Sequence, residues 1–149
     1  KQGCKLHFTI IGGGALEPQL REIVLKKNLG NIVEITGRTD PEDMPQLYRR
    51  NDILISASMQ EGMSNAMLEA MASGLPIITT RCEGLEELIA DNGLVVEPAN
   101  AEAIAKAVKK LADDRQLRRQ MSLAARRRAE QFSWSRAAEQ YLALYERLR

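Results

Sequence analysis

From Ile53 to Glu69 the chain reads Ile-Leu-Ile-Ser-Ala-Ser-Met-Gln-Glu-Gly-Met-Ser-Asn-Ala-Met-Leu-Glu. The apolar run at its start is typical of a buried strand, and the run that follows Ser64 favours a helix. The sequence therefore predicts a strand, a turn near Gly62 and a helix whose first backbone N–H groups have no helical acceptor. Those groups and the helix dipole favour an anion such as phosphate.

Two carboxylates bracket this helix start. Glu61 precedes it, and Glu69 is expected about two turns into it. Such a pair suits an elongated ligand with a diphosphate in its middle and hydroxyl groups at both ends, which describes a sugar nucleotide. On spacing alone, the more common interpretation is a Ser or Asn N-cap beside two solvated glutamates, because helix caps of this kind are widespread.

Strand-like and helix-like segments alternate along the whole chain. Repeated βα units of this length predict a single α/β domain over residues 1–149, with a Rossmann-like, doubly wound parallel sheet flanked by helices and a helical C-terminal tail. Asp40 is a candidate N-cap, with Pro41 in the first helical position. The expected strands are 6–11, 32–36, 52–56, 75–80 and 93–97, and the expected helices are 17–29, 41–50, 65–73, 83–90, 102–112, 115–131 and 135–148.

Three polar or glycine-rich loops fall at the carboxyl ends of these strands. They are Gly12-Gly13-Gly14, Gly37-Arg38 and Glu61–Asn65. Ligands of open parallel sheets bind at that edge. We therefore expect a ligand site there, although each loop is also open to an ordinary interpretation as a tight turn or an exposed arginine.

The composition argues against several other function classes. The net charge is +1, so no bulk field recruits nucleic acid, and Arg126-Arg127-Arg128 is expected to be a solvated helix face. With one His and two distant Cys, a zinc site is improbable. The two isolated thiols suggest a reducing cytosol. No apolar stretch approaches the roughly 20 residues that a membrane-spanning helix needs.

The glycine-rich loop also raises the possibility of a nicotinamide-dependent oxidoreductase. The dinucleotide motif G-x-G-x-x-G starting at Gly12 would require glycine at position 17, where this chain has Glu17. Glu34 does lie at a suitable distance for a ribose-binding acid. The missing third glycine nevertheless disfavours this function.

The run from Asn51 to Glu69 continues into Ala70-Met71-Ala72-Ser73-Gly74-Leu75-Pro76. Together these residues resemble the retaining family-4 glycosyltransferases of the GT-B fold, whose C-terminal domain carries an E-x7-E signature followed by Ala-Met-Ala-x-Gly-x-Pro. The resemblance continues from Glu83 to Gly93 and ends in Phe132-Ser133-Trp134, so it covers nearly the whole chain. It implies the donor-binding domain of a GT-B enzyme.

The resemblance also implies roles for individual residues. Glu69 would accept hydrogen bonds from the two ribose hydroxyls, since a carboxylate suits a vicinal diol. Glu61, the candidate catalytic residue, would face the donor sugar and help to stabilise positive charge near the anomeric carbon. Arg38 would contact the nucleobase. The remaining expected donor-binding residues are Gly12, Gly13, Gly37, Gly62, Met63, Ser64 and Asn65, of which the last four would offer backbone N–H groups to the diphosphate.

No metal or other cofactor is expected. The chain has no Asp-x-Asp motif, which carries the divalent metal in the other major glycosyltransferase architecture. In the GT-B design, a helix dipole and basic residues stabilise the leaving diphosphate instead. The expected substrate is a nucleoside-diphosphate sugar, with the base and sugar undetermined.

The chain departs from the family pattern in two places. Met63-Ser64 stands where the commonest form of the motif has Phe-Gly, so the diphosphate loop is expected to differ slightly. Nothing in Lys1–Lys5 matches the Arg and Lys that family members carry on and after the first strand of this domain. We therefore expect a fragment that lacks the first βα unit and the N-terminal acceptor domain, and that transfers no sugar alone.

The expected partners follow from that interpretation. They are the donor substrate and the acceptor domain of the same polypeptide, with no nucleic acid, and with membrane association only through the missing domain. The location is expected to be cytoplasmic. The apolar stripe of the tail, which includes Tyr141, Leu142 and Tyr145, would lose its partner surface and favour weak self-association.

Two further alternatives remain open besides the oxidoreductase. One is a nucleotide-binding module without catalysis, and the other is a different GT-B enzyme that resembles a phosphorylase or an epimerase. The E-x7-E run with Ala-Met-Ala-x-Gly-x-Pro favours a glycosyltransferase over the second of these.

Overall fold

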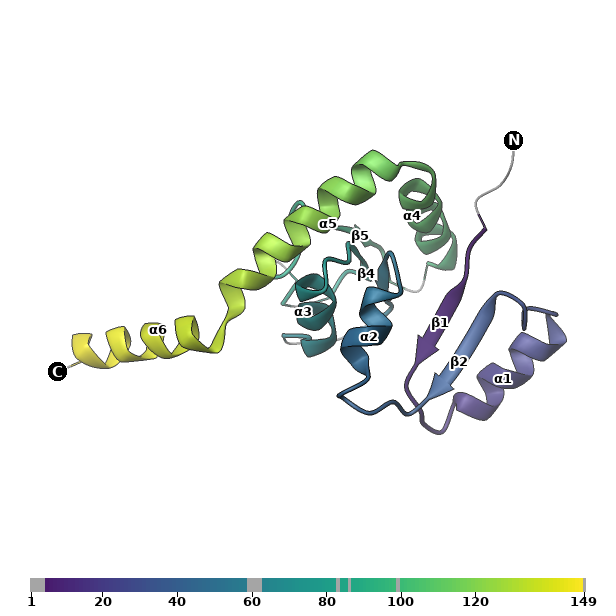
Figure 1. Cartoon of the computed structure of the whole chain (residues 1–149), viewed down its shortest axis with the longest axis horizontal. Helices are drawn as coiled ribbons and strands as arrows, with labels where there is room; N and C mark the ends of the chain where they lie inside the picture. The colour runs from purple at the N-terminus through teal and green to yellow at the C-terminus, as the bar shows by residue number, and fades with distance from the viewer. Residues whose placement is uncertain (1–4, 59–62, 83, 86, 99, 149) are drawn as a thin grey trace. The chain divides into compact units, whose positions relative to one another are not determined.

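The structure is a computed structural model that describes residues 5–58, 63–82, 84–85, 87–98 and 100–148. It divides into two compact units, Lys1–Pro45 and Gln46–Arg149. The named strands of both units pair in parallel (Figure 1).

The first unit contains one βαβ arrangement. It is built from β1 (Phe8–Ile11), α1 (Glu17–Lys26) and β2 (Val33–Gly37). Phe8 lies opposite Val33 in the parallel pair, and α1 packs against β2. The glycines that end the two strands, Gly12 and Gly37, both have positive φ angles. Such angles are readily adopted only by glycine, so these residues allow the chain to turn sharply at the same edge of the sheet.

The second unit is built on a three-stranded sheet in the order β3-β4-β5. Its elements are α2 (Met44–Arg49, at the unit boundary), β3 (Leu54–Ser56), α3 (Asn65–Ala72), β4 (Ile77–Thr80), β5 (Gly93–Val96), α4 (Ala101–Asp113), α5 (Arg115–Ala129), the 3-10 turn η1 (Glu130–Phe132) and α6 (Trp134–Arg147). Every residue of the central strand β4 is buried. In Figure 1, α5 runs along α3 and α4, and it packs against both.

The core of this unit consists of apolar side chains that the helices press onto β4. Leu111 of α4 and Met67 and Met71 of α3 are fully buried, as are Ile77 and Ile78 of the strand. Burying side chains of this size stabilises a fold by about 1.5–3 kcal/mol each. This core fixes α3 against the sheet, and α3 carries the predicted site residues Asn65 and Glu69.

The predicted α/β architecture of parallel strands flanked by helices is confirmed. The start of the second helix was predicted wrongly, because residues 41–43 form a turn, closed by the Asp43 N–H bonding to the Asp40 carbonyl at 3.0 Å, and α2 begins at Met44. The tail helices end within about two residues of their predicted bounds.

The short helix predicted over 83–90 is also wrong for the described part of that segment, which forms turns. The side chain of Asn92 provides the physical reason. Its amide accepts from the Ala90 N–H at 2.8 Å and donates to the Leu88 carbonyl at 3.0 Å. These bonds satisfy backbone groups that a helix would otherwise pair, while Leu85 and Leu88 are buried.

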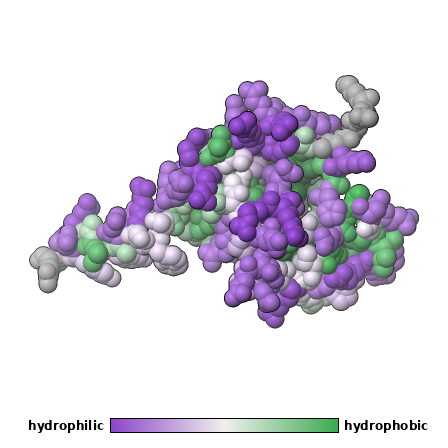
Figure 2. All heavy atoms as spheres, in the orientation of Figure 1, coloured by the Kyte–Doolittle hydropathy of each residue, from purple (hydrophilic) through white to green (hydrophobic). Residues whose placement is uncertain are grey.

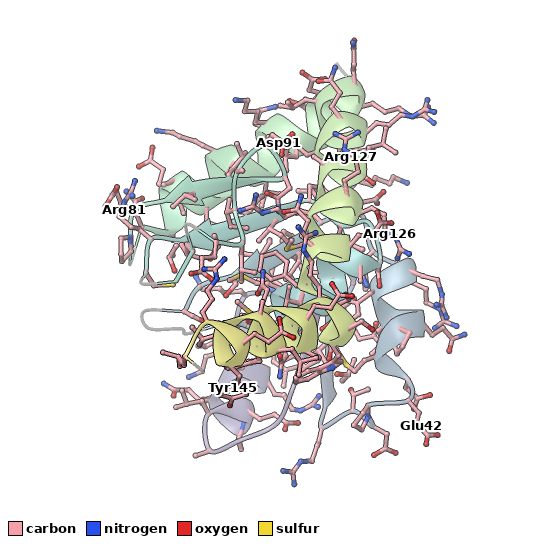
Figure 3. The ribbon with its side chains drawn as sticks, turned by 90° about the vertical axis from the view of Figure 1, so that its left-hand side faces the viewer. Glu42, Arg81, Asp91, Arg126, Arg127 and Tyr145 are labelled. Carbon is pink, nitrogen blue, oxygen red and sulfur yellow. The ribbon has the colours of Figure 1, made fainter. Side chains whose placement is uncertain are left out.

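The arginine run of α5 is partly engaged with the backbone of neighbouring segments. Arg126 donates to the carbonyl of Ala72 at the end of α3, and Arg128 donates to the carbonyl of Glu87 at 2.7 Å. Figure 3 shows Arg126 and Arg127 on α5. Cations at the end of a helix stabilise its terminal carbonyls, so part of this basic run supports the packing of α3.

The C-terminal helix α6 exposes large apolar side chains. Trp134 is 92% exposed, and Tyr141, Leu142, Leu144 and Tyr145 are exposed as well. Figure 2 shows apolar atoms among polar ones along this helix. Among the residues described, no helix combines the length and apolar character required to cross a bilayer.

Candidate functional site

The helix start that the sequence predicted after Gly62 is present at α3. Ser64 is its N-cap, and its hydroxyl oxygen accepts a hydrogen bond from the Met67 N–H at 3.4 Å. The Ser64 backbone has φ −77° and ψ 111°, a conformation open to any residue. Serine is therefore accommodated where the commonest family form has glycine, and its hydroxyl takes over capping of the helix.

The cap leaves the first two N–H groups of α3, those of Asn65 and Ala66, without an acceptor inside the helix. Both residues are exposed, whereas Ser64 is buried. Their N–H groups, together with the positive end of the helix dipole, form a suitable environment for a phosphate group. Met63, immediately before the cap, is 51% exposed.

Glu69 lies closer to this helix start than predicted. It follows Asn65, the first residue of α3, by four positions, so it lies about one turn into the helix rather than two. The side chain is exposed, while its neighbour Ala70 is buried against the core. The carboxylate therefore lies on the solvent-accessible side of α3, where a ligand can reach it.

The carboxylate of Glu69 is held by a tyrosine from a different helix. The hydroxyl of Tyr48, on α2, donates to Glu69 Oε2 at 3.1 Å. Tyr48 is only 4% exposed, so its ring packs in the interior and its hydroxyl reaches outward to the carboxylate. Burial, followed by the charge and hydrogen bond of Glu69, raises the pKa of Tyr48 to about 12.

This shift gives a pH-dependent prediction. The phenol of Tyr48 is expected to ionise near pH 12, whereas an unfolded tyrosine ionises near pH 10. Between these values the unfolded chain loses this proton first, so Tyr48 contributes stability that is complete below about pH 10 and declines as the pH rises. The difference in tyrosinate absorbance between the wild type and Tyr48→Phe isolates this phenol. A midpoint near pH 10 in that difference would contradict both the burial of Tyr48 and its bond to Glu69.

The two loops of the first unit meet at the carboxyl ends of its strands. The Gly12 N–H donates to the Gly37 carbonyl at 2.9 Å. A Cβ added to Gly13 would lie 3.3 Å from the Arg38 backbone nitrogen. The sequence prediction that these loops adjoin at one sheet edge is thus confirmed for Gly12, Gly13, Gly37 and Arg38. The side chain of Arg38 is exposed.

Glu17 occupies the space beside this junction. Its carboxylate is 2.7 Å from Arg21 Nη2, and its Oε2 lies 3.2 Å from the position of a Cβ on Gly13. In a dinucleotide site, this place at the start of the helix receives a pyrophosphate. A fixed carboxylate repels that group. Glu17 therefore disfavours a nicotinamide site in two ways: it replaces the third glycine of the motif, and it carries a negative charge.

Of the remaining predicted site residues, Glu61 and Gly62 lie outside the described residues. Met63, Ser64, Asn65 and Glu69 lie together around the start of α3, in the second unit. In the described parts of the chain, His, Cys, Asp and Glu side chains form no group of three or more that could hold a metal ion.

Sequence reasoning missed Tyr48. It lies 21 positions before Glu69, on another helix, and no spacing rule connects the two. The contact depends on how α2 and α3 pack.

Comparison with known proteins decides the family. The family model described as "Glycosyl transferases group 1" matches residues 1–128. This chain belongs to the group 1 glycosyltransferases. The assignment agrees with the fold and with the sequence motif around α3.

Individual group 1 relatives and solved structures agree with this assignment. Alpha-D-kanosaminyltransferase of Streptomyces kanamyceticus is 30% identical over 151 residues, covering 99% of this chain and 39% of the relative. The structure of sucrose-phosphate synthase from Thermosynechococcus elongatus matches 94% of this chain and 38% of its own, with 29% identity and a TM-score of 0.83. The pneumococcal O-GlcNAc transferase GtfA, solved with UDP and GlcNAc, matches 95% of this chain and 29% of its own, with 25% identity and a TM-score of 0.82. The chain thus spans about two fifths of the length of the curated relatives it matches.

Proposed function

We propose that this chain is the donor-binding C-terminal domain of a retaining glycosyltransferase of the family-4 type. The observation that carries the proposal is the exposed, Ser64-capped start of α3, with Glu69 one turn further along the same helix. The first feature suits the diphosphate of a nucleotide sugar, and the second suits its ribose. The UDP and GlcNAc bound to the related pneumococcal enzyme support a nucleotide sugar as the substrate class.

In this proposal, the residues around α3 divide the work of binding the donor. The N–H groups of Asn65 and Ala66 bind the diphosphate, together with the backbone of Gly62, Met63 and Ser64. They also stabilise the negative charge that develops on the diphosphate as the glycosidic bond breaks. Glu69 accepts hydrogen bonds from the ribose hydroxyls. The proposal also assigns base recognition to Arg38 and donor contacts to the Gly12, Gly13 and Gly37 turns, all of which belong to the first unit.

Glu61 faces the donor sugar and acts on the reacting centre. Its carboxylate holds sugar hydroxyls and stabilises the positive charge that builds near the anomeric carbon in the transition state. A ribose-binding Glu69 is not available to the sugar, so the pair does not act as the two carboxylates of a glycosidase, which flank one bond. We assign no covalent nucleophile.

The acceptor is held by a second domain of the same polypeptide, and transfer takes place in the cleft that the two domains enclose. The isolated chain therefore transfers no sugar, because correct placement of both reactants supplies much of the rate enhancement. The apolar residues of α6, which include Tyr141, Leu142 and Tyr145, contact that domain and favour weak self-association without it. The enzyme works in the cytoplasm, where isolated thiols remain reduced.

Titration calorimetry with UDP, GDP and ADP, each with and without EDTA, tests the substrate class and the absence of a metal requirement. We expect one of the three diphosphates to bind with modest affinity, and we expect EDTA to leave that affinity unchanged, because helix N–H groups take the role of a metal. Loss of binding in EDTA would contradict metal independence. Failure of all three nucleotides to bind would contradict the donor-binding role itself.

A further inference from the structure

The hydrogen bond between Tyr48 and Glu69 has a geometry that bears on ligand binding as well as on packing. Tyr48 is buried and belongs to α2, while the carboxylate it contacts is exposed on α3. The hydroxyl is 3.1 Å from Oε2. One end of the bond is therefore anchored in the interior, and the other is a side chain that solvent or a ligand can reach.

This anchoring restricts a side chain that would otherwise be mobile. An exposed glutamate has three rotatable bonds, and its ordering costs up to about 1.5–2 kcal/mol. Because the Tyr48 hydroxyl is itself fixed by packing, its hydrogen bond orders the Glu69 side chain in part before any ligand binds. Preorganisation of this kind raises affinity without adding a contact to the ligand.

The bond also leaves the acceptor capacity that a ribose requires. A carboxylate has two oxygens and about four lone-pair positions. The Tyr48 hydroxyl donates to Oε2, so Oε1 and a further position on Oε2 remain for two neighbouring hydroxyl groups. Because burial and the adjacent carboxylate disfavour the phenolate, Tyr48 remains a donor throughout the neutral range.

From this geometry we propose that Tyr48 is a positioning residue for nucleotide recognition: it orients the Glu69 carboxylate for the vicinal hydroxyls of the ribose. The proposal rests on the proposed function, in which Glu69 binds the ribose. Tyr48 does not touch the ligand, and its contribution appears only when the ligand carries the hydroxyls that Glu69 accepts.

The variant Tyr48→Phe tests this proposal because it removes the hydroxyl and keeps the ring in the core. The ligands are the best-binding member of UDP, GDP and ADP, and its 2′,3′-dideoxy counterpart. We expect Tyr48→Phe to weaken binding of the ribonucleotide about threefold to tenfold, the usual range for loss of one hydrogen bond. We expect the dideoxy nucleotide to bind both proteins within a factor of two. The matched control is Tyr145→Phe on the exposed helix α6, labelled in Figure 3, which should leave both affinities unchanged.

A purely structural role of Tyr48 gives a different pattern. Displacement of α2 or α3 would weaken binding of both nucleotides by the same factor, and that result would overturn the proposal. Equal affinity of the wild type and Tyr48→Phe for the ribonucleotide would overturn it as well. In a Glu69→Ala background, Tyr48→Phe should cause no further loss, because the carboxylate it positions is gone.

The same measurements separate this proposal from the function on which it rests. If Glu69→Ala discriminates against the ribonucleotide and Tyr48→Phe does not, Glu69 binds ribose without help from Tyr48, and only the positioning role is wrong. If the wild type itself binds the ribonucleotide and the dideoxy nucleotide equally well, Glu69 does not read the ribose, and the proposed function is wrong at this residue.

Discussion

Replacement of Glu61 by alanine is expected to reduce sugar transfer by the full-length enzyme by about two to three orders of magnitude. That is the usual cost of removing a group that stabilises developing charge in a transition state. The affinity for the free nucleoside diphosphate should hardly change, because the role proposed for Glu61 is at the sugar. Initial rates with labelled donor, together with calorimetry of the diphosphate, measure the two quantities.

Glu69→Ala is expected to give the opposite pattern. Loss of the proposed ribose acceptor should weaken diphosphate binding by roughly 1–3 kcal/mol, the range for polar groups left without partners. The same change also removes the partner of the buried Tyr48 hydroxyl, so a fall in stability is expected beside the loss of affinity. Glu69→Gln separates the loss of affinity from the loss of stability. Its amide oxygen still accepts from the Tyr48 hydroxyl, while the negative charge is lost.

The matched control for this pair is Glu102→Ala. Glu102 is an exposed glutamate on α4 that forms an ion pair with Lys106 on the helix surface. Pairs of this kind contribute little, so both affinity and rate should remain at the wild-type level. Equal losses of nucleotide affinity in Glu61→Ala and Glu69→Ala would show that the two carboxylates do not have separate roles.

Gly93→Ala is expected to be the most destabilising single methyl addition that the structure identifies among its described glycines. Gly93 lies opposite Ile77 in the parallel pair of β4 and β5. A Cβ at position 93 would lie 2.5 Å from the carbonyl oxygen of Ile77, which is backbone and cannot rotate away. The strands must separate to admit the methyl group, which costs about 1–3 kcal/mol for overpacking of a core.

Urea unfolding followed by circular dichroism measures this loss, and the midpoint should fall without a change of slope. Gly30→Ala is the control, because an added Cβ there meets no atom within 4 Å. It should be close to neutral. Equal midpoints for Gly93→Ala and the wild type would mean that β5 can shift away from β4 without loss of stability. That result would be contrary to its position beside the fully buried strand β4.

Much of the fold was readable from local patterns. Ser64 caps α3 as the run after Gly62 predicted, and Gly74 has the positive φ angle that ends a helix. The glycines at 12 and 37 turn the chain at the ends of their strands. These features depend on a few neighbouring residues, so sequence spacing is enough to find them.

Other predictions failed where a distant or competing contact decides. The segment 83–90 has helical spacing, yet the Asn92 side chain captures the Ala90 N–H and Leu88 carbonyl, and the described residues there form turns. Residues 41–43 likewise turn before α2 begins. In each case a side chain or turn satisfies backbone groups that the helical pattern alone would have assigned to a helix.

The sequence by itself determined the βα alternation, the capped helix start and the family, because periodicity, caps and motifs are local properties of the chain. Only the tertiary structure decided which side chains meet across elements. The Tyr48 hydroxyl donates to Glu69, and the Gly93 backbone lies against the Ile77 carbonyl. Each of these contacts joins residues from different elements, whose approach depends on packing of the core rather than on spacing along the chain.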